Sequence, residues 1–210
     1  MNASVLLAIS ILFAVVNNLL LHGVDDKGLR GMGDTLLFNA LVSLIWLVIL
    51  AVLNKGIRIS AQSWLWGIGY GSVMSVFLLC KMQAMATGPV SITSFIGCSS
   101  LIIATAFGVF YFHEQVTVLQ TVGVMCLVLA LFLTVSKSKN NSAKEEKTEK
   151  TWFLWCALFF ICSGATGIVF KLHQSSPASG EVNQMMLAAS ITSIVLFFIS
   201  SVIVQRKADK

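Results

Sequence analysis

Residues 108–123 read GVFYFHEQVTVLQTVG, and they join two apolar runs, 90–112 and 117–135. Neither run contains an Asp, Glu, Lys or Arg residue. Each is long enough to cross a bilayer core of about 30 Å, which takes roughly 20 helical residues. His113 and Glu114 lie where the first run ends. The stretch therefore predicts two transmembrane helices joined by a short polar turn.

Five further apolar runs of similar length lie on either side of this stretch. They are expected to span the membrane at 3–21, 35–53, 63–80, 152–170 and 185–204. The chain is 57% hydrophobic and 11% charged, with a mean hydropathy of +0.87, and a soluble domain carries about 25% charged residues. A β-barrel would show alternating segments of about 10 residues instead of continuous runs. The sequence thus predicts an all-α integral membrane protein, a polytopic bundle of about seven transmembrane helices.

One polar stretch, SKSKNNSAKEEKTEK at 136–150, divides the predicted helices. Its mixed charges and lack of large apolar residues predict a flexible linker over 137–150. Residues 1–136 then hold five helices, and residues 151–210 hold two. The run LFNALVSLIWLVIL at 37–50 can be laid on MLAASITSIVLFFI at 186–199 without gaps. We therefore expect a five-helix repeat followed by a partial second repeat, inverted because the helix number is odd.

The basic residues are distributed unequally between the two sides of the predicted bundle. Eleven of the 14 lie in the segments that follow the first, third, fifth and seventh helices, and three lie on the opposite side. Because positively charged loops remain in the cytoplasm, the linker and the C-terminus are expected there. The net charge of +5 comes mostly from these loop lysines, so we expect no nucleic-acid partner.

The His113–Glu114 pair does not predict a metal site. A zinc protease motif needs a second histidine four residues after the first, and Thr117 stands at that position. Thr117 and Gln120 instead have the spacing of a capping box at the start of the next helix. A carboxylate at Glu114, just before a helix N-terminus, is also favoured by the helix dipole. The sequence therefore predicts a tight turn at the membrane surface, with no catalytic residue, metal or cofactor.

The stretch 84–135, which begins AMATGPVSITSFIG, resembles the half-repeat of EamA-type transporters in the drug/metabolite transporter superfamily. The residues that carry this resemblance are Ala84, Ala86, Pro89, Glu114, Gln120 and Gly123, with Thr117 in the same turn. The resemblance implies ten helices in two inverted repeats around a central cavity, and substrates such as metabolites, amino acids, nucleotide sugars or drugs. Since seven helices are predicted here, two explanations stay open: the sequence is part of a longer protein, or two copies form a homodimer.

Polar side chains within the predicted helices are the candidates for a solute pathway. Those with hydroxyl or amide groups are Asn17, Asn18, Asn39, Ser91, Thr93, Ser94, Ser99 and Ser100. Each amide either lines a cavity or bonds a neighbouring helix, and each hydroxyl either faces the pathway or bonds its own helix. Lys81 and Lys171 have two interpretations as well: they snorkel to the surface, or they bind an anionic group of the substrate. Gly67 and Gly71 form a small-residue stripe for helix packing.

These observations predict a transporter that moves small metabolites or drug-like compounds by alternating access. The alternative is a seven-helix receptor or sensor without transport activity. A retinal protein needs a lysine inside its last helix, and 185–204 has none. An intramembrane enzyme is not expected, because the predicted spans hold no histidine or acid at membrane depth. The expected surroundings are the lipid of the plasma membrane and a small-molecule substrate.

Overall fold

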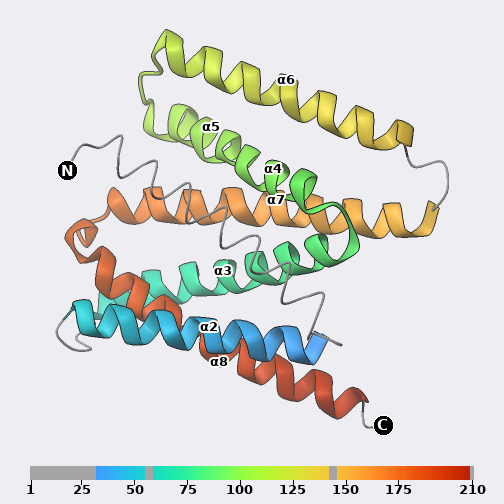
Figure 1. The fold of residues 1–210 in the computed structure, drawn as a ribbon. Helices are drawn as coiled ribbons and strands as arrows, with labels where there is room; N and C mark the ends of the chain where they lie inside the picture. Colours follow the sequence, from blue (N-terminus) through green and yellow to red (C-terminus); the bar gives the residue numbers. More distant parts are fainter. Residues whose placement is uncertain (1–31, 55–58, 142–145, 209–210) are drawn as a thin grey trace.

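The computed structural model describes residues 32–54, 59–141 and 146–208, and these are almost entirely helical (Figure 1). The helices are α2 Met32–Leu53, α3 Ala61–Thr87, α4 Val90–Ser99, α5 Leu101–Phe112, α6 Val118–Asn141, α7 Glu146–Gln174 and α8 Val182–Ala208, with a 3₁₀ turn, η1 Ser179–Glu181, before α8. No strand occurs in the parts described. The predicted span at 3–21, with Asn17 and Asn18, lies outside the described residues.

The predicted class of fold, a polytopic helical membrane protein, is confirmed. Within the described residues, five segments are long and apolar enough to cross a membrane: Gly33–Leu53, Ala61–Thr87, Val90–Phe112, Thr151–Gln174 and Ser179–Gln205. A shorter apolar helix covers Val118–Ala130. The total of seven spans remains a prediction, because the first lies outside the described residues.

Two predicted boundaries differ from the structure. Helix α3 continues past the expected end at residue 80 to Thr87, because MQAMAT consists mostly of good helix formers and Pro89 comes only after it. Helix α6 continues to Asn141 and α7 begins at Glu146. Residues 137–141 and 146–150, which were expected in a flexible linker, are therefore helical, because Lys and Glu are good helix formers.

Helix α3 occupies the centre of the bundle and packs against α7 and α8 (Figure 1). Helix α8 also pairs along its length with α2, and α7 pairs with α5. Helix α6 lies at the edge and leaves Val118, Leu119 and Met125 exposed. Such an apolar surface is expected where a membrane helix faces lipid. Helix α7 is thus the element that connects the centre of the bundle to α4 and α5.

Candidate functional site

The predicted helix over 90–112 is interrupted at Ser100, halfway along the span. The N–H of Ser100 donates to the carbonyl of Gly97 at 3.2 Å, and the N–H of Ile103 donates to the carbonyl of Ser100 at 3.0 Å. Both bonds join residues three apart, so the helix tightens locally into a 3₁₀ turn, a feature that often marks a hinge. The Ser100 hydroxyl donates to the same Gly97 carbonyl at 2.6 Å, which stabilises the interruption.

Helix α7 passes this interruption at close range. The hydroxyls of Ser100 and Ser163 are hydrogen-bonded at 2.6 Å, which joins α4–α5 to the middle of α7. A Cβ built on Gly164 would lie 2.6 Å from Ile103, and one on Gly167 would lie 2.9 Å from Ala104. These glycines allow α5 and α7 to approach closely, as small residues do in membrane bundles. The interruption therefore lies inside a tight helix–helix contact at mid-membrane.

Lys81 lies on α3 near the same level of the bundle. Six residues of α3 follow it, which puts it about 9 Å from the end of the helix at 1.5 Å per residue. Its side chain is half-buried, and it lies on the side of α3 that approaches Cys98 of α4. Lys81 is therefore a cationic group within the α3 span, whereas the sequence placed it just after the end of that span at residue 80.

The other predicted pathway residues do not form one wall. Thr93 is fully buried; it accepts from Trp152 Nε1 at 3.1 Å and donates to the Ala84 carbonyl at 3.4 Å. Ser99 is also buried, and its hydroxyl bonds the Phe95 carbonyl of its own helix at 2.9 Å. Ser91 is exposed and Ser94 is half-buried. The hydroxyls of α4 thus have three different surroundings: Thr93 bonds other segments, Ser99 bonds its own helix, and Ser91 is exposed.

Asn39 takes the second of its two predicted roles, hydrogen bonding within and between helices. Its amide is buried and donates to the Thr35 carbonyl at 2.8 Å, one turn earlier in α2. The same group lies 2.9 Å from the Met82 sulfur of α3. Asn39 therefore links α2 to α3 and does not meet the hydroxyls of α4.

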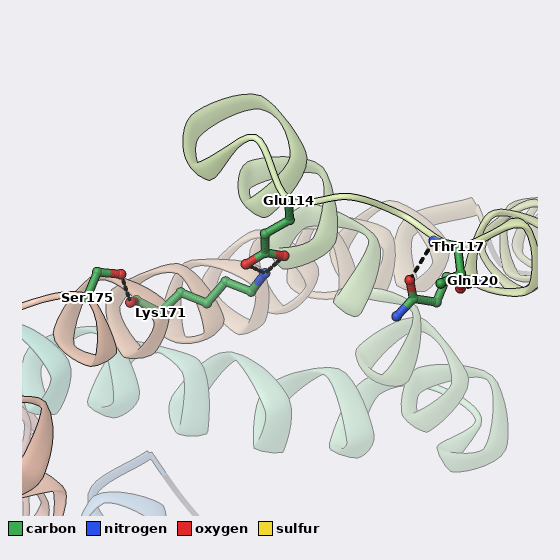
Figure 2. Close-up of polar contacts among 5 residues, drawn as sticks. All are labelled: Glu114, Thr117, Gln120, Lys171 and Ser175. Atoms are coloured by element: carbon green, nitrogen blue, oxygen red, sulfur yellow. Dashed lines mark hydrogen bonds and ion pairs between the residues drawn. The ribbon is translucent and has the colours of Figure 1, made fainter.

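Glu114 and Lys171 form an ion pair, although 57 positions separate them (Figure 2). The ammonium group of Lys171 donates to Glu114 Oε1 at 3.0 Å and to Oε2 at 2.7 Å. Gly108 lies against this ion pair, and any Cβ there would overlap both charged groups. Sequence reasoning treated the two residues separately. The available signal was topological: opposite charges end two predicted spans on the same side of the membrane.

The predicted capping box is confirmed in the turn that follows (Figure 2). The Thr117 N–H donates to Gln120 Oε1 at 2.9 Å, and the Gln120 N–H donates to Thr117 Oγ1 at 3.4 Å. His113 ends α5 in the left-handed conformation, with φ of 52°. Pro89 precedes α4 at its N-cap, and Gly123 has open space around it. Pro89, His113, Thr117 and Gln120 therefore mark helix ends, whereas Gly123 lies within α6.

We predict a modest coupling energy between Glu114 and Lys171. Their side chains are 49% and 28% exposed, and pairs with this much exposure contribute about 0.2–1 kcal/mol after solvent screening. Unfolding in mixed SDS micelles, followed by circular dichroism, should give this coupling in a double-mutant cycle of Glu114→Gln and Lys171→Met. The exchanged pair, Glu114→Lys with Lys171→Glu, should regain part of it. If the unfolding free-energy changes of the two single variants add up to that of the double variant, the ion pair contributes nothing to stability.

The described residues hold no group of three or more His, Cys, Asp or Glu side chains placed to bind a metal ion. Charged side chains near the candidate site are instead paired or isolated, as at Glu114–Lys171 and Lys81. The site is therefore built from hydroxyls, glycines and one lysine within apolar helices. The described residues thus belong to a multi-pass integral membrane protein whose 90–112 span is interrupted near its middle.

The chain belongs to the EamA-like transporter family, whose model matches residues 28–136, just over half of its length. The match covers α2 to most of α6 and includes the interruption at Ser100, the turn at Glu114 and the capping box. It confirms the family resemblance of the sequence. No curated protein and no solved structure matches the chain.

Proposed function

We propose that this chain moves a small polar solute across the membrane by alternating access, with the solute bound beside Ser100 and Ser163. The observation that carries the proposal is the interruption of the 90–112 span at mid-membrane. In secondary transporters, solute sites lie near the bilayer midplane and are typically formed by discontinuous helices. Here the interruption brings a hydroxyl from the first half of the chain against one from the second half.

Contacts along α7 support the same mechanism, because they join the two halves at three levels. Trp152 bonds Thr93 at one end, Ser163 bonds Ser100 in the middle, and Lys171 pairs with Glu114 at the other end. The 19 helical steps from Trp152 to Lys171 span about 28 Å of helix, close to the bilayer core thickness. Opening one end while the other stays closed would expose the middle to one side at a time. We propose that the two end contacts are the gates.

Lys81 supports an anionic solute. Its ammonium lies within the span near the interruption, where a charge is costly unless it is paired or hydrated. A carboxylate or phosphate group on the solute would supply that pairing. We further propose a plasma-membrane location with 136–150 on the cytoplasmic side, on the basis of the loop charges. Lipid and this solute are the proposed partners, and a homodimer is the proposed assembly.

Flux in proteoliposomes tests the proposal. The chain is reconstituted and uptake is measured for a panel of radiolabelled amino acids, organic acids and nucleotide sugars. For the solute that is moved, Ser100→Ala should reduce flux about tenfold, since one hydrogen bond to a bound solute is worth about 1.4 kcal/mol. Lys81→Met should reduce flux of anionic solutes more than flux of neutral ones, because it removes only the charge.

Ser190→Ala is the matched control. Ser190 lies on α8, and its hydroxyl bonds the Met186 carbonyl of its own helix at 2.9 Å, so its loss should leave flux unchanged. Reconstituted protein with no flux for any solute on the panel would contradict the transport proposal. Equal flux in the Ser100→Ala and Ser190→Ala variants would instead move the solute site away from the interruption.

A further inference from the structure

A second polar cluster lies where α3 begins and α7 ends, outside the site described above. Its residues are Ser60 at the N-cap of α3, Ser63 and Trp66 of α3, His173 of α7, Glu181 of η1 and Gln184 of α8. The Glu181 carboxylate accepts from the hydroxyls of both serines, each at 2.5 Å. Gln184 Oε1 accepts from the Ser60 N–H at 3.3 Å. Glu181 therefore caps the N-terminus of α3 from another element, where the helix dipole stabilises its negative charge.

His173 is the unusual member of this cluster. Its side chain is completely buried, and neither ring nitrogen has a hydrogen-bond partner among the described residues. Its ring instead packs edge-to-face on Trp66, with centroids 6.0 Å apart and an interplanar angle of 83°. A buried polar group without a partner is destabilising and calls for an explanation in a native structure. The imidazole of His173 could therefore form a new hydrogen bond if its protonation state or its surroundings changed.

We propose that His173 is a proton-binding site whose protonated form is neutralised by Glu181. A proton from the aqueous phase at this end of the bundle binds the ring nitrogen that lacks one, and the imidazole becomes an imidazolium. Glu181 stays ionised and exchanges at least one serine hydroxyl for the new imidazolium N–H. Histidine suits this role because its charge changes near neutral pH. Glu181 lies within electrostatic range of a positive charge on the His173 ring.

The charges around His173 leave Glu181 as its acidic partner. Helix α3 and its N-cap present Ser60, Ser63 and Trp66 to the cluster, and α8 presents Gln184; none of these four is charged. On α7 itself, Lys171 is already paired with Glu114. Lys55 and Arg58 precede α3 in sequence and lie outside the described residues. Among the described residues of this cluster, Glu181 is therefore the carboxylate that can neutralise a protonated His173. The same carboxylate accepts the hydrogen bonds of Ser60 and Ser63 at the start of α3.

This arrangement connects a proton to the movement of helices. Glu181 immediately precedes α8 and bonds α3, so any change in its partners alters how the two helices are joined at this end. His173 lies two residues after Lys171, which forms the proposed gate with Glu114. A role for this cluster in coupling protons to transport rests on the proposed function. Proton binding at His173 does not depend on transport, so an experiment can refute either claim without the other.

Two measurements on the full chain in lipid nanodiscs test the proposal. With ¹⁵N-labelled histidine, the ring signals of His173 should convert from the neutral to the charged pattern between pH 8 and pH 5; Glu181→Gln should suppress this conversion. Over the same interval, hydrogen exchange of backbone amides in 59–64 and 175–184 should accelerate about tenfold beyond the intrinsic pH effect, as expected for weakened capping bonds. His173→Gln should abolish the acceleration.

His113→Asn is the matched control, because His113 is exposed and asparagine tolerates its left-handed backbone. This variant should keep both the His173 conversion and the exchange response. A His173 ring that stays neutral down to pH 5 would overturn the proposal, as would an unchanged exchange response in His173→Gln. If these results hold while no solute flux is found, the proton site stands and the transport proposal fails.

Discussion

Gly67→Ala and Gly71→Ala should each destabilise the bundle by about 1–3 kcal/mol, the usual cost of overpacking a tight contact. A Cβ on Gly71 would lie 2.6 Å from the Ala189 carbonyl oxygen of α8, and one on Gly67 would lie 3.0 Å from the Met185 carbonyl oxygen and would overlap the Ala188 side chain. These neighbours belong to the backbone or to a side chain without rotamers. They can yield only if α3 and α8 move apart.

The expected effect is large because the two glycines belong to a longer contact surface. Ser63, Gly67, Gly71 and Ser75 are all buried and recur every fourth residue, so they form one face of α3. The Gly71 carbonyl accepts hydrogen bonds from Ser75 of its own helix at 2.7 Å and from Ser193 of α8 at 3.2 Å. Separating the helices would lengthen the bond to Ser193 as well as weaken the packing.

Gly69 provides the matched control in the same helix. Nothing lies within 4 Å of a Cβ built there, so Gly69→Ala should leave stability unchanged or raise it by up to about 1 kcal/mol through helix propensity. All three variants are compared by SDS titration with circular dichroism. If Gly67→Ala and Gly69→Ala unfold at the same SDS fraction, the close α3–α8 contact is wrong. The double variant should be less than additive, because both glycines meet the same segment of α8.

The sequence predicted the helices well because lipid imposes strong and simple demands on a chain. Uninterrupted apolar runs must be helical where backbone groups have no water to bond, and Thr117 with Gln120 places a helix start by local spacing alone. The end of α3 was misplaced because Lys81 is charged, whereas the backbone continues until Gly88 and Pro89 stop it. Charge predicts membrane depth, and helix ends depend on local backbone chemistry.

The candidate site was predicted less well because its contacts join residues far apart in sequence. Ser100 was expected among the pathway residues, yet its partner Ser163 comes from α7 and carries no local signal. Glu114 and Lys171 were both noticed, but their pairing depends on the packing of α5 against α7. His173 follows the predicted span 152–170, and no local pattern indicates that its side chain is buried. Apolar helices specify insertion strongly and their mutual register only weakly.

Trp152→Ala should destabilise the chain by about 3–5 kcal/mol, the range for deleting a large aromatic side chain from a packed core. Trp152 is buried at the start of α7 in a cluster with Ala84, Ile96 and Cys156. Its ring fills the space beside Gly88, where a Cβ would overlap the indole. The side chain therefore fixes α7 to the α3–α4 turn, the end opposite the Glu114–Lys171 pair.

Trp152→Phe separates packing from hydrogen bonding. Phenylalanine keeps most of the apolar contact but removes the indole N–H that donates to Thr93, while the Thr93 hydroxyl can still donate to the Ala84 carbonyl. The loss should therefore be only about 1 kcal/mol.

Trp46→Ala is the control, because Trp46 on α2 is 55% exposed and its removal should change stability by less than about 0.5 kcal/mol. Unfolding in SDS, followed by circular dichroism, ranks the three variants. Equal losses in Trp152→Ala and Trp46→Ala would show that α7 is not anchored at this turn. The proposed gating mechanism would then lose the Trp152–Thr93 contact as one of its two gates. Only the contacts at Ser163 and Lys171 would still join α7 to α4 and α5.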